Sequence, residues 1–306
     1  MSGPGEPGGA GAAELTARSG RFSLPVRVFG QGIPMIFLHG LGSDSRDSRR
    51  DLGELPGFRL ALPDQRGHGG SRPRPDPGEF ALDSMVGDLR AMLTALDWPA
   101  TVVAGGSMGA AVALRHVLTG PADCPALVLV APALGPDRPG AAPLLTAVAD
   151  RIDAVGLQQA VAELRGGATA AERDGAAAGE GDRGPATERD GGRPGAGHAG
   201  SGGGPAEAGD GLDGWLRQDG AALAAGMRAV PSWRPLTVMD DLAGLTLPVA
   251  LVAIHGDPLH PVDLAARMHA FLPRSSLEVL GSPDEARRPG AIGEAVLRGL
   301  RRLGIS

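Results

Sequence analysis

The chain of 306 residues contains no lysine, asparagine or tyrosine, so all 29 of its basic Lys or Arg side chains are arginines. Without lysine, Schiff-base chemistry and the phosphate-binding lysine of a P-loop are excluded. General acid or base chemistry must therefore come from histidine, aspartate, glutamate or the single cysteine.

Cysteine and metal-binding patterns are equally scarce. Cys124 is the only cysteine, so an internal disulfide is excluded, and its place beside Pro125, ahead of an apolar run, is typical of a loop or core residue. The seven histidines are scattered, and no His-Glu-x-x-His or paired-cysteine pattern occurs. The glycines form no dinucleotide-binding fingerprint. We therefore expect neither a metal nor a cofactor.

The charge balance gives no sign of a nucleic-acid partner. The net charge is -6 and the isoelectric point is about 5.7, without a basic patch. No apolar run reaches membrane-spanning length, and residues 1–19 lack the basic start and apolar centre of a signal peptide. These features predict a cytoplasmic protein with a disordered tail over 1–19 and a small apolar or ester substrate. The oligomeric state stays open.

The most informative motif is Gly105-Gly106-Ser107-Met108-Gly109, which lies between an apolar run and a helix-forming stretch. It has the G-x-S-x-G pattern of a nucleophile elbow, in which a strained turn between strand and helix lifts the serine hydroxyl above the sheet. In a chain with 50 glycines the pattern alone is weak, but the strand before it and the helix after it support it. Ser107 is the candidate nucleophile.

Four segments resemble the α/β-hydrolase family and occur in the family's order: Phe37-Leu38-His39-Gly40-Leu41-Gly42, Asp64-Gln65-Arg66-Gly67-His68-Gly69, the elbow, and Asp257-Pro258-Leu259-His260-Pro261. The resemblance covers about residues 21–135 and 244–304. It implies an α/β fold with a mostly parallel sheet, helices on both faces and an inserted helical cap. The same scaffold carries many activities, so it does not identify the substrate.

Hydrophobic patterning locates the elements of this fold. Apolar helical spacing predicts a helix over 80–96 in which Met85 and Met92 pack in the core. Strands are expected at 21–29, 34–38, 58–62, 101–104, 126–131, 248–254 and 276–280. The expected domains are the tail 1–19, the first part of the core 20–134, the cap 135–243 and the second part of the core 244–306.

The predicted cap contains a low-complexity insertion over 166–211 that lacks large apolar side chains and should be disordered. Helical patterns flank it at 144–164 and 212–227. Nine apolar residues could form a roof over the active site or could merely pack the cap onto the sheet. They are Leu144, Leu145, Val148, Ile152, Trp215, Leu216, Leu223, Met227 and Trp233.

Acyl transfer also needs an acid that orients the base and donors for the oxyanion. The resemblance implies that the backbone N–H groups of Leu41 and Met108 form the oxyanion hole. It also assigns the acid to Asp257, which follows an apolar run. Asp257 could instead cap the helix that starts near Pro261.

The base is the missing part of the family pattern, because residues 281–288, after the last predicted strand, contain no histidine. His260 could serve, since it follows Asp257 by three residues at the carboxyl edge of the sheet, or it could only line the pocket. The other candidates fit less well. They are the loop residues His39 and His68, the helical His116 and His269, His198 in the insertion, His255 at a strand end, and the carboxylates Asp284 and Glu285, whose pKa would have to be raised by burial.

Together these residues predict a serine hydrolase that cleaves a small or apolar carboxylic ester through an acyl-enzyme on Ser107. Two alternatives stay open: a non-hydrolytic enzyme on the same scaffold, such as a lyase, cyclase or cofactor-free oxygenase, and a degenerate hydrolase that only binds a ligand. The run Arg46-Asp47-Ser48-Arg49-Arg50-Asp51 could steer an anionic substrate, but its alternating charges favour a solvated face.

Overall fold

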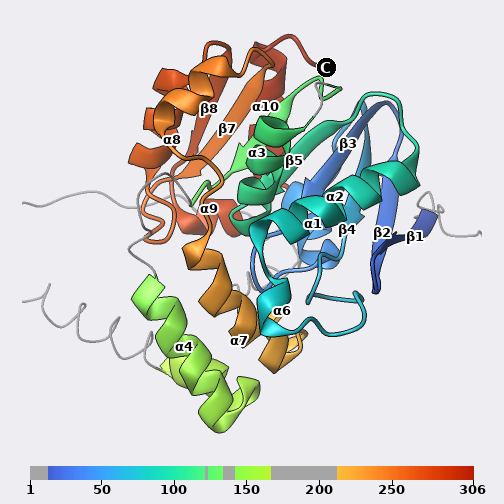
Figure 1. Cartoon of the computed structure of the whole chain (residues 1–306). Coiled ribbons are helices and arrows are strands. Elements are labelled where there is room, and N and C mark those ends of the chain that lie inside the picture. The colour runs from blue at the N-terminus through green and yellow to red at the C-terminus, as the bar shows by residue number, and fades with distance from the viewer. Residues whose placement is uncertain (1–12, 121–122, 134–141, 167–211) are drawn as a thin grey trace, which may run out of the picture.

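The computed structural model describes residues 13–120, 123–133, 142–166 and 212–306 (Figure 1). The predicted disorder of 1–12 and of 167–211 falls outside these residues, as does His198.

Eight strands form one sheet in the order β1-β2-β4-β3-β5-β6-β7-β8. The β1–β2 and β2–β4 pairs are antiparallel, and the other pairs are parallel, which confirms the expected mostly parallel sheet. Every predicted strand is present within a few residues. The bounds are β1 Ala13–Ser19, β2 Phe22–Gly30, β3 Ile33–Leu38, β4 Phe58–Pro63, β5 Val102–Gly106, β6 Leu127–Val130, β7 Val249–Ile254 and β8 Ser275–Leu280.

Strand β1 corrects the predicted boundary of the tail. Residues 13–19, assigned to the disordered segment from their neighbours' composition, pair with β2 from Ala13 opposite Val28 to Ser19 opposite Phe22. Ala17 is fully buried within this strand. An edge strand is stabilised by the hydrogen bonds it makes to its neighbour, and short-range composition does not report these.

Helices cover both faces of the sheet. Successive side chains of a strand point to opposite sides, so apolar side chains lie on both faces and both need to be covered. In β3, Met35 and Phe37 belong to one core cluster, whereas Ile36 and Leu38 belong to the other. The first cluster contains residues of α1 and α10, and the second contains residues of α2, α3 and α8. These helices are α1 Ser45–Leu52, α2 Leu82–Leu96, α3 Met108–Thr119, α8 Val262–Phe271 and α10 Ala291–Arg302, with the short α9 Pro283–Arg287 before α10.

Helix α2 confirms the amphipathic helix predicted over 80–96. Met85 and Met92 are both buried in the core, as expected from their spacing.

The helical segments inserted between β6 and β7 are α4 Ala142–Val155, a helical stretch over 157–166, α6 Asp213–Leu216 and α7 Gly220–Ala229. The helix predicted over 144–164 is interrupted at Gly156, whose φ of 84° lies in the left-handed region. The pattern over 212–227 is likewise divided, and Asp219 caps α7 by accepting from the N–H of Ala222. Figure 1 shows α4 and α7 together beyond the lower end of the sheet.

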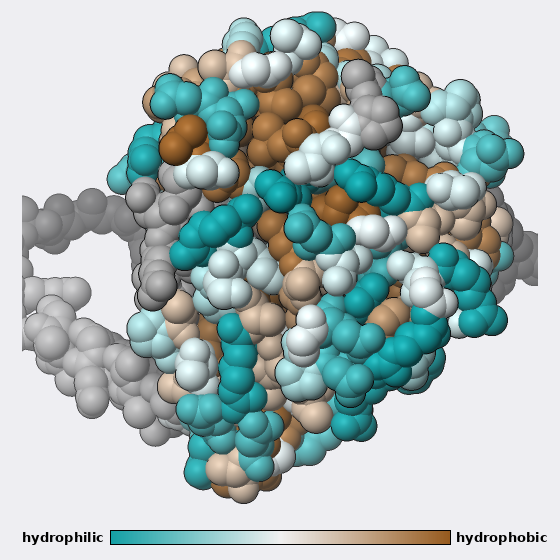
Figure 2. Space-filling view, viewed as in Figure 1, coloured by the Kyte–Doolittle hydropathy of each residue, from teal (hydrophilic) through white to brown (hydrophobic). Residues whose placement is uncertain are grey.

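Hydrophilic residues cover much of the face seen in Figure 2, and hydrophobic residues gather there in separate patches. Within the described ranges, no helix has both the length and the apolar character needed to cross a bilayer.

Candidate active site

Ser107 occupies the sharp turn between β5 and α3 with φ 50° and ψ -109°, a backbone conformation that a residue with a side chain rarely adopts. Its N–H donates to the carbonyl of Val130 at 3.0 Å. The flanking glycines are required by space. A Cβ on Gly105 would lie 2.3 Å from the backbone of Gly109, and one on Gly109 would lie 2.1 Å from the Leu38 carbonyl oxygen. The turn therefore has the geometry of a nucleophile elbow.

Asp257 organises the loop that follows β7. Gly256, with φ 77°, turns the chain, and one oxygen of Asp257, Oδ1, accepts from the N–H groups of Leu259 at 2.9 Å and His260 at 3.2 Å. Such a carboxylate-centred turn folds the chain back over the aspartate. The predicted alternative, a cap for α8, is not what the structure contains: the N-cap of α8 is Pro261, and no side chain caps it.

The folded loop brings His260 between Asp257 and Ser107. His260 Nδ1 lies 2.7 Å from Asp257 Oδ2, and His260 Nε2 lies 2.8 Å from Ser107 Oγ. Because an ionised carboxylate only accepts, Nδ1 carries the proton and Nε2 is free to accept from the serine hydroxyl. Burial raises the pKa of Asp257, but the hydrogen bond and charge of His260 and the two loop N–H groups outweigh burial and lower that pKa overall.

His39 and His68 hold the loops beside this site. The N–H of Gln65 donates to His39 Nε2 at 3.0 Å, and the N–H of Gly42 donates to His68 Nε2 at 3.1 Å. Each ring also donates from Nδ1 to a backbone carbonyl. Burial lowers the pKa of His39, and burial together with the nearby His39 lowers the pKa of His68 to about 3. Both rings are therefore neutral supports of the loop at Gly42.

The other histidines in the described ranges make no hydrogen bond to Ser107. His255 and His269 are exposed, and His269 Nδ1 lies 2.7 Å from the hydroxyl of Ser275. His116 is buried on α3, and its Nδ1 has no partner there.

Helix α9 lies after β8, where the family pattern places its histidine. Asp284 pairs with Arg287 at 2.6 Å, and Glu285 accepts from the N–H of Gly281 at 2.6 Å. Both carboxylates are exposed. Neither carboxylate is therefore in the buried setting that a carboxylate base requires.

The two predicted oxyanion donors lie in the loops around the serine. Met108 is the first residue of α3, so its N–H has no acceptor within the helix. Leu41 follows Gly40, on which a Cβ would lie 3.5 Å from the Ser107 Cβ. Its N–H has no acceptor among the described residues. Both groups are therefore available to a ligand.

A cavity of about 350 Å³ opens beside Asp257 and His260, and Leu41, Trp215 and Ile254 contribute apolar parts of its wall. Among the described residues, no group of three His, Cys, Asp or Glu side chains is arranged to hold a metal ion. Charged side chains also line the cavity, namely Asp47, Arg50, Asp51 and Arg287. The lining therefore suits a small organic group with apolar and polar parts.

Most of the nine residues predicted as a possible apolar roof do not line this cavity. Trp215 is the one of the nine that lines this cavity. Trp233 packs in the core and donates from Nε1 to the Phe80 carbonyl at 2.9 Å, and Leu144 is 55% exposed. Side chains within the inserted helices pack on one another rather than on the cavity, because these short helices can bury apolar surface only together. They are Val148, Ile152, Leu223 and Met227, with Leu145 and Leu216 against them.

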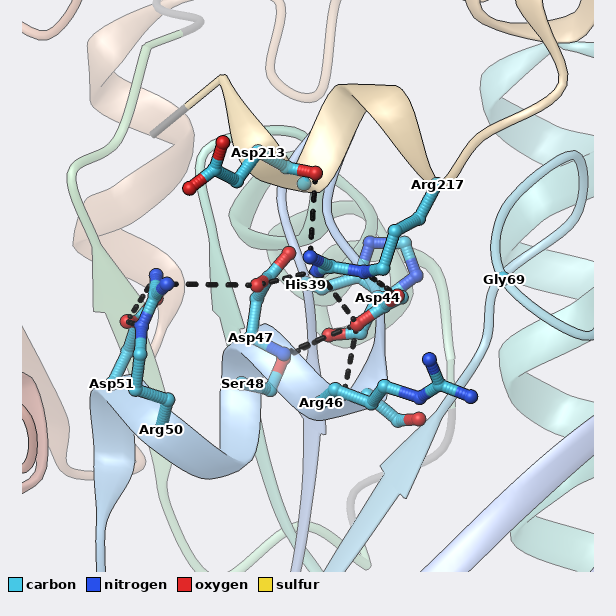
Figure 3. Close-up of polar contacts among 12 residues, drawn as sticks. His39, Asp44, Arg46, Asp47, Ser48, Arg50, Asp51, Gly69, Asp213 and Arg217 are labelled. Atoms are coloured by element: carbon cyan, nitrogen blue, oxygen red, sulfur yellow. Dashed lines mark hydrogen bonds and ion pairs between the residues drawn. The ribbon is translucent and has the colours of Figure 1, made fainter. Parts of the chain in front are cut away.

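A partly buried ion-pair cluster lies next to the cavity, and sequence reasoning missed it. Arg217, at the end of α6, reaches Asp44 and Asp47 at the start of α1 (Figure 3). Asp44 caps α1 by accepting from the N–H groups of Arg46 at 2.8 Å and Asp47 at 3.1 Å. The run over 46–51 is thus not simply the solvated face predicted, because Asp47 and Ser48 are buried. An aspartate before a helical stretch indicates a helix cap, so the role of Asp44 could have been predicted. Its pairing with Arg217 could not, because nothing in the neighbouring sequence indicates that partner.

Comparison with known proteins agrees with this fold. Residues 33–283 match the family described as alpha/beta hydrolase fold. The AB hydrolase superfamily protein YisY of Bacillus subtilis is 38% identical over 97 residues, which are 31% of this chain and 35% of that protein. Lipase LipV of Mycobacterium tuberculosis is 34% identical over 116 residues, which are 37% of this chain and 43% of that protein. The matches thus span well under half the length of these curated relatives.

Two solved structures are similar over nearly the whole chain. An esterase from Exiguobacterium antarcticum superimposes with a TM-score of 0.68 at 17% identity, covering 94% of this chain and 100% of that one. A thermophilic esterase from Thermogutta terrifontis gives a TM-score of 0.68 at 20% identity, covering 96% and 99%. At these identities the likeness concerns the fold. The family match over most of the sequence and the sheet described above establish that this chain belongs to the alpha/beta hydrolase fold family.

Proposed function

We propose that this chain is a serine hydrolase that cleaves a small or apolar carboxylic ester through an acyl-enzyme on Ser107. The observation that carries the proposal is the 2.8 Å contact between His260 Nε2 and Ser107 Oγ, with Asp257 on the other ring nitrogen. A nucleophile, a base and an acid that orients the base are the parts that acyl transfer requires. The similarity to a lipase in sequence and to esterases in fold supports an ester as substrate.

In the acylation step, the Ser107 oxygen attacks the ester carbonyl carbon while His260 Nε2 accepts the hydroxyl proton. Asp257 accepts from His260 Nδ1–H and stabilises the imidazolium that forms. The N–H groups of Leu41 and Met108 donate to the carbonyl oxygen as it becomes negative. The intermediate then expels the alkoxide, which takes the proton from Nε2, and the acyl group stays on Ser107.

In the deacylation step, the same groups act on water. His260 Nε2 accepts a proton from the water as its oxygen attacks the acyl carbon, and it then returns this proton to the Ser107 oxygen. The products are the carboxylic acid and the free serine. The cavity of about 350 Å³ is at the lower end of ligand pockets, which span roughly 300–1,000 Å³, so we expect a small substrate group there.

The test is intact-mass spectrometry after incubation with a fluorophosphonate, together with the hydrolysis of p-nitrophenyl butyrate. The natural protein is expected to gain one phosphonyl group and to hydrolyse the ester, whereas Ser107→Ala should do neither. His260→Ala should be labelled more slowly, and its ester hydrolysis should be slower by a factor of about 10³ or more. His255→Ala is the matched control, because His255 lies on the same loop and is exposed.

The outcomes separate the alternatives. Labelling at Ser107 that is slowed by His260→Ala and not by His255→Ala supports the proposal. A natural protein that is neither labelled nor active on esters would exclude a serine hydrolase. Labelling that is equally fast in His260→Ala would reject His260 as the base.

A further inference from the structure

We propose that Arg217 is a positioning residue for ester hydrolysis: it docks α6 on the oxyanion loop, defined as residues 40–44, and thereby fixes the Leu41 N–H. This inference rests on the proposed function, in which Leu41 is an oxyanion donor. It assigns to the inserted helices a part in the chemical step, in addition to the contact that Trp215 makes with the cavity.

The first support is the arrangement of charges. Arg217 Nε lies 3.1 Å from Asp44 Oδ2, and Arg217 Nη2 lies 2.6 Å from Asp47 Oδ1, so one guanidinium bridges two carboxylates (Figure 3). The side chains of Asp44 and Asp47 are only 5% and 10% exposed. Ion pairs that are buried on one side are screened less than surface pairs. Removing Arg217 would take from Asp44 the ion pair described here and would leave Asp47 with Arg50 at 3.8 Å.

The pKa of Asp44 is consistent with this role. Burial raises the pKa of this carboxyl, but the hydrogen bond from Arg217 and the N–H donors of α1 outweigh burial, so that the pKa lies below its ordinary value. Asp44 is therefore ionised at neutral pH and holds the chain where the oxyanion loop enters α1.

The second support is close packing between α6 and the loop. A Cβ on Gly42 would lie 2.5 Å from the indole of Trp215, so the ring sits directly on the Gly42 backbone. A Cβ on Gly214 would lie 2.6 Å from Asp47 Oδ2 and 3.1 Å from the Gly42 carbonyl oxygen. Glycine at both positions allows a contact that any side chain would push apart. Movement of α6 is thus transmitted to Gly42, the neighbour of Leu41.

The third support is that the loop is held from both sides. On the core side, the N–H of Gly42 donates to His68. On the cap side, Arg217 reaches Asp44 of the loop. The neighbouring Gln218 ties α6 to the adjacent loop, because it accepts from the N–H of Gly69 at 2.9 Å and donates to the Gly214 carbonyl at 3.0 Å. Loss of Arg217 removes the charged member of the cap-side contacts and leaves the core side intact. We therefore expect the loop to shift and the fold to persist.

The test compares Arg217→Ala with Arg228→Ala. Arg228 is the matched control because it also pairs with two aspartates, Asp150 and Asp153, which belong to the inserted helix α4 and not to the oxyanion loop. We would measure kcat and KM for p-nitrophenyl butyrate and the inhibition constant of a trifluoromethyl ketone, which forms an oxyanion on the serine. A displacement of about 1 Å in an active site can lower the rate by up to about 100-fold.

For Arg217→Ala we expect kcat to fall about tenfold or more and the inhibition constant of the ketone to rise by a similar factor. KM should change by less than about threefold, because an oxyanion donor acts on the transition state. Arg228→Ala should keep the natural values. Added guanidinium ion should restore part of the lost kcat in Arg217→Ala and have no effect on Arg228→Ala.

The inference is overturned if folded Arg217→Ala has the kcat of Arg228→Ala, or if the change is confined to KM. If Arg217→Ala does not fold, Arg217→Lys is measured instead. One ammonium cannot take the place of two guanidinium nitrogens, so its kcat should lie well below the natural value, and a natural kcat would reject the role. A natural protein without esterase activity rejects the proposed function and this inference together, whereas an active protein with unaltered Arg217 variants rejects the inference alone.

Discussion

Replacing His68 by glutamine should make the protein less sensitive to acid. The ring is buried, 2% exposed, and it accepts the N–H of Gly42 only while its Nε2 is unprotonated. A glutamine carbonyl can accept the same N–H, but it cannot titrate. The substitution therefore removes one proton-binding site while it leaves an acceptor near the oxyanion loop.

The magnitude follows from the pKa of His68, which is lowered to about 3 by burial and by the neighbouring His39, against an ordinary value of 6.5. The unfolded chain binds a proton at this site at a higher pH than the folded chain does. The contribution is therefore fully present above pH 6.5 and is lost as the pH falls toward 3, by about 1.4 kcal/mol per pH unit. Between pH 7.5 and 5 the loss attributable to His68 is about 2 kcal/mol.

The assay is urea unfolding followed by circular dichroism at a series of pH values. His68→Gln should be less stable than the natural protein at pH 7.5 but should lose about 2 kcal/mol less on going to pH 5. Contributions from Asp44 and the other carboxylates are common to both proteins and cancel in this difference. His269→Gln, which replaces an exposed histidine, is the control. Equal losses in the natural protein and His68→Gln would refute the reasoning.

Three substitutions test other parts of the fold. Gly109→Ala should abolish ester hydrolysis, because its Cβ would meet the Leu38 carbonyl oxygen at 2.1 Å; normal activity with unchanged circular dichroism would contradict this. Gly87→Ala, in α2 with open space around it, should instead raise the unfolding free energy by about 0.5–1 kcal/mol in urea unfolding. A lower unfolding free energy would contradict this expectation. Asp88→Ala should lower the unfolding free energy by about 3–5 kcal/mol, because it leaves Arg66 buried without the carboxylate that it contacts at 2.6 Å; a loss below 1 kcal/mol would argue against this.

Local patterns were sufficient to predict most of the sheet and the elbow. Each predicted strand is an apolar run whose burial follows from its own composition, and the elbow needs small residues that are visible at Gly105 and Gly109. The carboxyl edge of the sheet was equally predictable, because parallel strands bring their ends together. The prediction that Asp257 and His260 lie together at this edge used this property, whereas Ser107 was predicted from the elbow motif.

Long-range contacts explain what sequence reasoning did not resolve. That His260 reaches both Asp257 and Ser107 depends on a turn held by two N–H groups, which no residue pattern specifies by itself. Strand β1 depends on a neighbouring strand for its stability. The ion pair of Arg217 joins residues separated by 173 positions, and no local signal could identify it.

Because Asp257 and His260 share one loop, all three site residues follow strands in the interior of the sheet. Ser107 follows β5 and the other two follow β7, and both strands have neighbours on either side. Strand β8, at the edge of the sheet, carries none of the three. Edge strands open more readily than interior ones, because they have hydrogen-bonded neighbours on one side only. We therefore expect amide exchange to be faster in β8 than in β5, the strand that leads into Ser107.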